Sequence, residues 1–119
     1  MPHLTVEYSS NLAGFHKAEV LHALNQAVAS SPEVKDESDL KTRLVALDDF
    51  EIGTAPASRA FVHAQLRLLS GRTPEAKKDL GERIADVLRR LTPKPAGFMV
   101  QLSVEMVDMD RASYVKEKL

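Results

Sequence analysis

The sequence predicts an α+β domain in which two β-α-β units form one four-stranded mixed sheet, with two helices on one face. Two observations lead to this fold class. Polar and apolar residues alternate strictly at 3–8, and they alternate again from Val100 to Met106 within the segment 99–107, as in half-buried strands. Apolar residues recur at three- and four-residue spacing in two longer segments, each followed by a further strand pattern, which is typical of amphipathic helices.

The first half of the chain contains a strand, a helix and a second strand. Leu4, Val6 and Tyr8 share one face of the first strand. The helix is predicted over about 15–30, where a Ser-Ser-Pro sequence stops it. A polar connection then leads to the second strand, predicted over about 41–49.

The second half repeats this order. A strand is predicted over about 59–69, followed by a tight turn. Thr73 is a good N-cap for the second helix and Pro74 suits its first position. This helix ends before Pro93, and the last strand follows at 99–107.

The two halves, about 2–50 and 59–107, are expected to build a single domain spanning residues 1–119. A helix that connects two strands of one sheet makes a right-handed crossover between parallel strands. Two helices cover only one face of such a sheet, so the other face meets solvent or another subunit. That face is unusually polar and includes His3, Thr5, Glu7, His63, Gln65, Arg67, Gln101, Ser103 and Glu105.

Composition excludes several classes of function. The formal net charge of −1, from 16 basic and 17 acidic residues, provides no electrostatic footprint for nucleic acid. No apolar run is long enough for a membrane span, and the start lacks a signal region, so we expect a cytoplasmic protein. The absence of cysteine excludes disulfides, thiolate nucleophiles and cysteine-based metal sites.

Pro2 is the first candidate for chemistry because it follows Met1 directly. A small or proline side chain at this position normally permits removal of the initiator Met, which leaves a secondary amine at the start of the first strand. An α-amine has a pKa of roughly 8, and burial or nearby cations lower that pKa towards the value that suits a general base. Many proteins begin Met-Pro without any catalytic role, so this dipeptide alone is weak.

Three cations are candidate anion-binding groups. Arg72 follows a glycine at the start of the second helix, where the helix dipole also favours an anion. Lys41 and Arg43 are two residues apart on the second strand, so both point to one face and lie near Pro2 if that strand runs beside the first. An exposed turn arginine and a pair of cations on a strand edge are the simpler interpretations.

No metal or phosphate site is predicted. His3 and His63 fall on the same polar face, but no supporting cluster completes a zinc site, so we assign both to packing and hydrogen bonding. The sequence contains no glycine-rich phosphate loop, no nucleophile elbow and no plausible serine triad.

Together these segments resemble 5-carboxymethyl-2-hydroxymuconate Δ-isomerase, a member of the tautomerase superfamily with 4-oxalocrotonate tautomerase and macrophage migration inhibitory factor. The resemblance spans nearly the whole chain. It rests on the start Pro2-His3-Leu4-Thr5-Val6-Glu7-Tyr8-Ser9, on Lys41-Thr42-Arg43 followed by Asp48, on Phe61-Val62-His63 and on Gly71-Arg72.

The resemblance implies a homotrimer with the sheets around a central axis, the helices outside and one active site near each amino-terminal proline. It implies that Pro2 is the general base and that Arg72 binds substrate. Lys41 stands where the family has an arginine, Arg43 is also arginine in the family, and Phe50 occupies an aromatic position that lines the pocket. No cofactor is implied.

The leading hypothesis is proton transfer along a conjugated acid, most simply 5-carboxymethyl-2-hydroxymuconate, during the degradation of aromatic compounds. Two alternatives stay open. The replacement at Lys41 favours a promiscuous tautomerase of another keto or enol acid. Retention of Met1 favours a non-catalytic trimeric binding protein, because the Pro2 nitrogen is then an amide without a basic lone pair.

Overall fold

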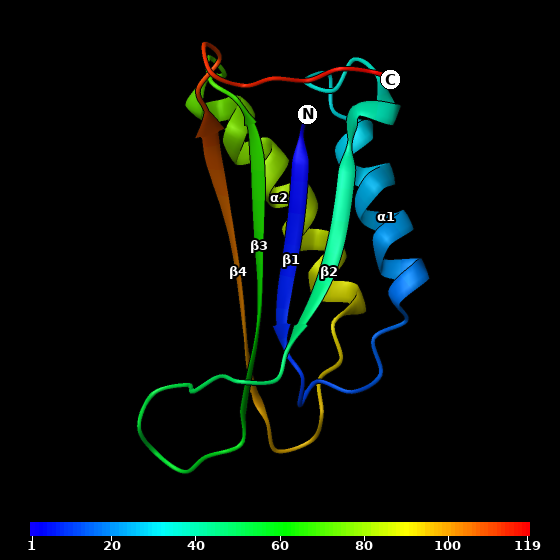
Figure 1. Ribbon diagram of the computed structural model, residues 1–119. Helices are drawn as coiled ribbons and strands as arrows, with labels where there is room; N and C mark the ends of the chain where they lie inside the picture. Colours follow the sequence, from blue (N-terminus) through cyan, green and yellow to red (C-terminus); the bar gives the residue numbers. More distant parts are fainter.

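Two helices lie on one face of a four-stranded sheet in the computed structural model, which describes residues 1–119 (Figure 1). The elements in chain order are β1 (His3–Ser9), α1 (Lys17–Ala29), the short 3-10 helix η1 (Glu37–Asp39), β2 (Lys41–Leu47), β3 (Arg59–Leu69), α2 (Pro74–Leu91) and β4 (Met99–Met109). The predicted order of strands and helices is confirmed. No helix in the chain is both long and apolar enough to cross a bilayer.

The strand order across the sheet is β2-β1-β3-β4. β1 and β2 are parallel, as are β3 and β4, whereas the two central strands β1 and β3 are antiparallel. Each β-α-β unit therefore contributes one parallel pair, and the two units meet through the central antiparallel pair. This arrangement is the predicted mixed sheet.

The helices begin and end for local reasons. The Thr73 side chain caps α2 by accepting a hydrogen bond from the Ala76 amide at 3.1 Å, and Pro74 occupies the first turn, as predicted. α1 begins at Lys17, two residues later than predicted, and His16 at its N-cap position makes no side-chain cap. β2 ends at Leu47 rather than near residue 49, because two consecutive aspartates follow it in a bend.

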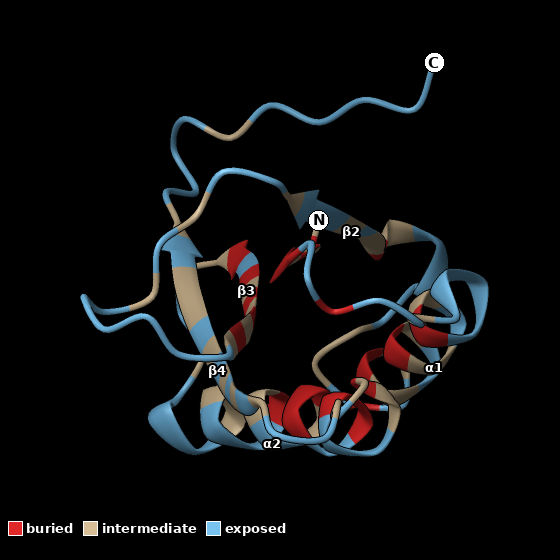
Figure 2. Ribbon diagram, turned by 90° about the horizontal axis from the view of Figure 1, so that it is seen from below, coloured by how far each residue is buried: buried red, intermediate tan, exposed pale blue.

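The core lies between the sheet and the helices. Figure 2 shows both helices on the same side of the sheet, with the buried residues concentrated where the two layers meet. Alternate residues of β1 and β3 point into this layer, where they pack against an apolar stripe on each of α1 and α2. The fully or nearly fully buried members include Leu4, Val6, Val20, Leu24, Val28, Val62, Leu66, Leu68, Leu80, Ile84 and Leu88.

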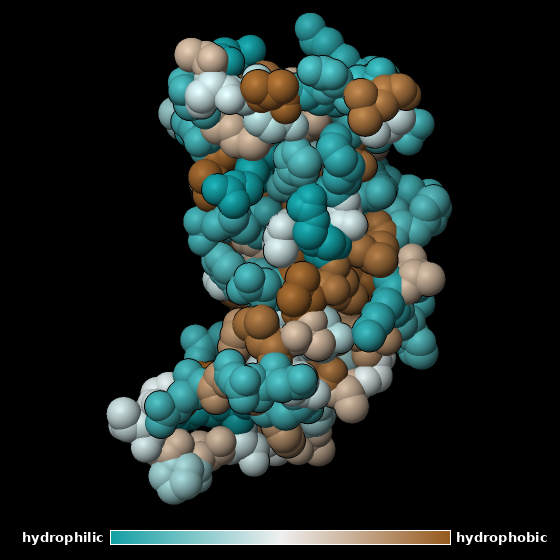
Figure 3. All heavy atoms as spheres, in the orientation of Figure 1, coloured by the Kyte–Doolittle hydropathy of each residue, from teal (hydrophilic) through white to brown (hydrophobic).

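The other face of the sheet, called the open face below, is not covered by any helix. Strand register places the predicted polar residues together on it, since His3 pairs with Arg67, Thr5 with Gln65, Glu7 with His63, and His63 with Ser103. Figure 3 looks onto this face and shows a largely hydrophilic upper part with a hydrophobic patch lower down. Val45 of β2, which is 37% exposed, belongs to this face.

Candidate active site

Pro2 lies at the start of β1, in the middle of the sheet, and is buried. Its carbonyl accepts a hydrogen bond from the Lys41 amide at 3.1 Å. The next residue, His3, pairs with Lys41 of β2 on one side and with Arg67 of β3 on the other. The amino terminus, the start of β2 and the end of β3 therefore meet at one end of the sheet.

The electrostatics of this end favour a neutral amine. Burial, followed by the positive charges of Lys41 and Lys116, lowers the pKa of the Met1 amine from 8.0 to about 5. Asp39 opposes this shift. The charged form of the terminal amine is therefore disfavoured at this position.

His3 is held by two side chains. Its Nδ1 lies 3.0 Å from Nη2 of Arg43, and its Nε2 lies 2.9 Å from the hydroxyl of Tyr114. Burial, then the charges of Lys41, the terminal amine and Arg43, lowers the pKa of the imidazole below 6.5. As the spacing predicts, Lys41 and Arg43 lie on one face beside the start of β1.

The last ten residues form a tail that crosses the amino-terminal end of the sheet, from the end of β4 to η1 (Figure 1). Besides Tyr114, the tail supplies Lys116, which is ion-paired with Asp39, and Lys118, whose Nζ lies 3.6 Å from Asp36. At its start, Arg111 Nε donates to the carbonyl of Ser70 at 2.6 Å. The sequence shows this segment only as short and charged and does not predict its contact with His3.

Arg72 lies at the same end of the molecule, in the turn between β3 and α2. The preceding residue, Gly71, has a φ of +114°, which favours glycine. The Arg72 guanidinium donates to the Leu69 carbonyl at 2.7 Å and to the Glu33 carbonyl at 3.4 Å. Its Nε lies 3.4 Å from the Glu33 carboxylate but is buried without a hydrogen-bond partner. The Nε of Arg72 is thus enclosed beside Glu33 without a well-formed hydrogen bond.

Phe50 lies at the opposite end of the sheet from Pro2. It follows the end of β2 and packs edge-on against Phe61, with ring centroids 6.2 Å apart and an interplanar angle of 77°. The length of β2 alone separates the two ends of the sheet by roughly 20 Å. Within one chain the structure does not bring Phe50 to Pro2, Arg72, Lys41 or Arg43.

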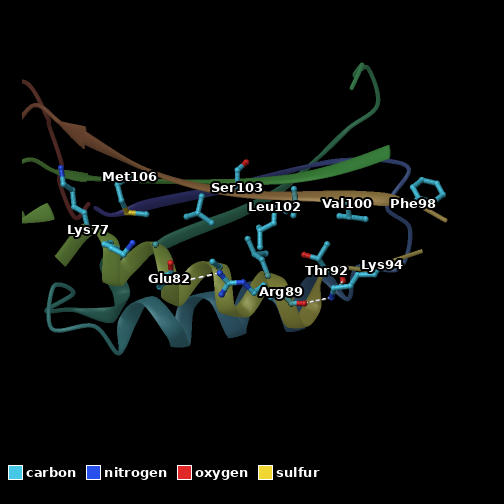
Figure 4. Close-up of a pocket in the computed structure, with 16 residues that line it drawn as sticks. Lys77, Glu82, Arg89, Thr92, Lys94, Phe98, Val100, Leu102, Ser103 and Met106 are labelled. Atoms are coloured by element: carbon cyan, nitrogen blue, oxygen red, sulfur yellow. Dashed lines mark hydrogen bonds and ion pairs between the residues drawn. The ribbon is translucent and has the colours of Figure 1, made fainter. Parts of the chain in front are cut away.

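One cavity lies away from the amino terminus. It has a volume of about 780 Å³ and lies between α2 and β4 (Figure 4). Val100, Leu102 and Met106 of the strand line it together with Lys77 and Arg89 of the helix. None of the predicted site residues contributes to it, so we place the candidate site at the cation-rich end of the sheet on chemical grounds.

The four-stranded sheet of two β-α-β units, together with a match to an isomerase family model over residues 2–118, shows that this chain is an isomerase of the tautomerase superfamily. It belongs to the 5-carboxymethyl-2-hydroxymuconate isomerase family, whose model matches residues 2–118. A 5-carboxymethyl-2-hydroxymuconate isomerase from Deinococcus radiodurans R1 has a similar structure, with a TM-score of 0.84 and 29% identity over 99% of this chain and 90% of that one.

Two further solved structures share the fold. A 5-carboxymethyl-2-hydroxymuconate delta-isomerase has a TM-score of 0.74 and 24% identity, covering 100% of this chain and 88% of its own. A fused 4-OT described as an asymmetric trimer has a TM-score of 0.67 and 18% identity, covering 96% and 91%. A comparison with curated protein sequences finds no match.

Proposed function

We propose that the chain is a cofactor-independent isomerase that moves a proton along a conjugated 2-hydroxymuconate-type acid in the degradation of aromatic compounds, with 5-carboxymethyl-2-hydroxymuconate as the first substrate to test. The family match over residues 2–118 supports the reaction class. The observation that carries the proposal is the position of Pro2, buried at the head of the central strand beside Lys41.

Pro2 acts as the general base once Met1 has been removed. Its nitrogen is then a secondary amine at a sheet end where burial and the charges of Lys41 and Lys116 lower the pKa of the present terminal amine to about 5. A base works best when its pKa lies near the operating pH. Neutral Pro2 takes a proton from one atom of the conjugated dienol, the oxygen of its 2-hydroxyl group, and returns it to a carbon further along the system, so that the enol becomes a ketone and the double bonds shift.

Arg72, Arg43 and Lys41 hold the carboxylates of the substrate and stabilise the dienolate that develops during proton transfer. Arg72 is suited to this role because its guanidinium stays partly exposed and has the Glu33 carboxylate as its one ion-pair partner. Arg43 is exposed and bonds only to His3, so its remaining donors are available.

Phe50 contributes to the site of a neighbouring subunit in a homotrimer. Its position at the far end of the sheet removes it from Pro2 of its own chain, and the uncovered open face with its apolar patch offers a surface for subunit packing. A structurally similar protein is described as a trimer. One aromatic ring per subunit then lines the pocket of the next.

The decisive experiment follows the ultraviolet absorbance of 5-carboxymethyl-2-hydroxymuconate with wild type and with Pro2→Ala, which keeps a small residue after Met1. We expect Pro2→Ala to lose most of the activity, on the order of a hundredfold or more, since general base catalysis contributes about that much. Equal activity in the two proteins would exclude Pro2 as the general base. Mass spectrometry of untagged protein establishes whether Met1 has been removed.

A second candidate function is a tautomerase of another keto or enol acid. The observation that favours it is Lys41, a lysine where the resembling family has an arginine, because an ammonium lacks the planar fork that binds a carboxylate bidentately. Comparing kcat/KM over a panel of substrates that includes phenylpyruvate distinguishes the two candidate functions. A clear preference for 5-carboxymethyl-2-hydroxymuconate excludes the second candidate.

A further inference from the structure

Three cationic side chains surround His3 on the open face. Two of them, Lys41 and Arg67, pair with His3 from the two neighbouring strands. Lys41, His3 and Arg67 therefore form one row across β2, β1 and β3. Arg43 lies one row further along β2, on the same face, and reaches back to His3 Nδ1 at 3.0 Å. Neighbouring strands are spaced by about 4.8 Å, so the row from Lys41 to Arg67 spans about 10 Å.

None of these three cations has a carboxylate within ion-pair distance. The arginines and lysines that do form ion pairs, at Arg72, Lys77, Arg83, Arg89, Lys116 and Lys118, all lie off this row. Arg67 is exposed and makes no side-chain hydrogen bond, and Lys41 donates only to the Asp39 carbonyl. Lys41, Arg43 and Arg67 are therefore cations without an ion-pair partner.

The acidic residues of the open face lie further along the strands, away from this row. Glu105 accepts from His63 at 2.6 Å, and Glu7 sits beside His63 in the strand register, two residues along β1 from Thr5 and four from His3. His3 itself adds no negative charge, and its pKa is lowered by burial and then by Lys41, the terminal amine, Arg43 and Arg67. The open face is thus divided into a cationic end at Pro2 and an acidic middle.

We propose that Arg67 is a specificity-determining residue that, together with Lys41 and Arg43, binds a second carboxylate of the substrate on the open face. The proposal rests on the proposed function, since the bound acid is the one that Pro2 deprotonates. Arg67 supplies a planar guanidinium fork on one flank of His3, whereas the other flank carries Lys41, which has no fork. The row therefore selects acids with two well-separated carboxylates over monocarboxylates.

The kinetic test compares Arg67→Gln with Arg90→Gln, a matched change at an exposed arginine of α2 that forms no ion pair. For 5-carboxymethyl-2-hydroxymuconate, Arg67→Gln is expected to raise KM by about tenfold or more with kcat little changed, because a charge-assisted hydrogen bond made equally in ground and transition states is lost. For the monocarboxylate phenylpyruvate, kcat/KM stays within about twofold of wild type. A KM within about twofold of wild type on the first substrate overturns the proposal.

A binding test keeps this inference separate from the reaction. The imidazole signals of His3 are followed by NMR while glutarate, a non-reacting diacid, or acetate is added to wild type and to Arg67→Gln. We expect saturable shifts with glutarate in wild type, binding about tenfold weaker in the variant, and no saturation with acetate. If wild type binds glutarate but has no isomerase activity, the proposed reaction is rejected and the Arg67 site is retained. Equal glutarate binding in wild type and Arg67→Gln overturns the proposed role of Arg67.

Light scattering on the same two proteins tests the competing role of Arg67 as a contact between subunits. The proposal expects the same oligomeric state in wild type and Arg67→Gln at equal chain concentration. A change of oligomeric state in the variant assigns Arg67 to subunit packing and overturns its role in substrate binding.

Discussion

Arg43 and His3 are joined across β2 and β1 by a contact of 3.0 Å between Nη2 and Nδ1. A guanidinium has no acceptor, so Nδ1 of His3 accepts this hydrogen bond. The proton of the neutral ring is then on Nε2, which donates to the hydroxyl of Tyr114 at 2.9 Å. The two neighbours thus fix one neutral tautomer of His3 beside Pro2.

This tautomer predicts a pH-dependent stability. The pKa of His3 is lowered in the folded chain, so the unfolded chain binds the proton first as the pH falls below 6.5. The contribution of His3 is fully present above 6.5 and is lost as the pH falls towards the folded pKa. Urea unfolding at about pH 7.5 and about pH 5 should show a smaller loss of stability in His3→Gln than in wild type, because glutamine keeps an acceptor and a donor but does not titrate. Equal losses in both proteins contradict the assigned tautomer.

Lys41→Ala is expected to shift the pH dependence of kcat/KM. In the processed enzyme the rate rises with pH as the Pro2 amine loses its proton, and Lys41 lowers the pKa of an amine at this position. Removing the charge should move the rising limb upward by about one pH unit, in addition to any loss of substrate affinity. Lys17→Ala, an exposed lysine at the start of α1, serves as the control and should leave the limb in place. An unmoved limb in Lys41→Ala would show that the charge of Lys41 does not set the pKa of the amine.

Glu33→Gln is expected to tighten substrate binding. The Glu33 carboxylate lies 3.4 Å from Nε of Arg72 and competes with a substrate carboxylate for that guanidinium. Neutralising it leaves the backbone contact from Arg72 to the Glu33 carbonyl intact. Partly exposed ion pairs are worth at most about 1 kcal/mol, so KM should fall by up to about fivefold. Glu37→Gln, in η1, is the control, and a higher KM in Glu33→Gln would instead assign Glu33 to orienting Arg72.

Burial between the sheet and the helices determines how much stability is lost when a core side chain is truncated. Ile84 of α2 is fully buried among the residues of the core, so Ile84→Ala should lower the free energy of unfolding by about 2–5 kcal/mol. Val115, in the tail, is 81% exposed, and Val115→Ala should stay within about 0.5 kcal/mol of wild type. Both are measured by urea unfolding at one fixed chain concentration, since association also contributes to apparent stability. A small loss in Ile84→Ala would show that the core collapses around the missing side chain.

Local pattern was sufficient to predict the sheet and both helices. The alternation around Leu4 and Val6, and the Thr73-Pro74 helix start, depend on neighbours within a few residues, and the structure confirms them. The contact between His3 and Tyr114 joins residues 111 positions apart, and no periodicity encodes it. The pairing of His3 with both Lys41 and Arg67 likewise depends on strand order, which the sequence left open.

The position of Phe50 leads to a complementation experiment. Phe50 lies at the far end of the sheet from Pro2 in the same chain, so the proposed pocket combines Pro2 of one subunit with Phe50 of another. Pro2→Ala and Phe50→Ala should each be nearly inactive as pure proteins, while each retains its fold by circular dichroism. If the two are unfolded together and refolded as mixed trimers in equal amounts, about a quarter of the pockets combine an intact Pro2 with an intact Phe50 from different chains. Activity should therefore reappear in the mixture. If both residues served one pocket within a single chain, no mixed pocket would be intact and the mixture would stay as inactive as its parents.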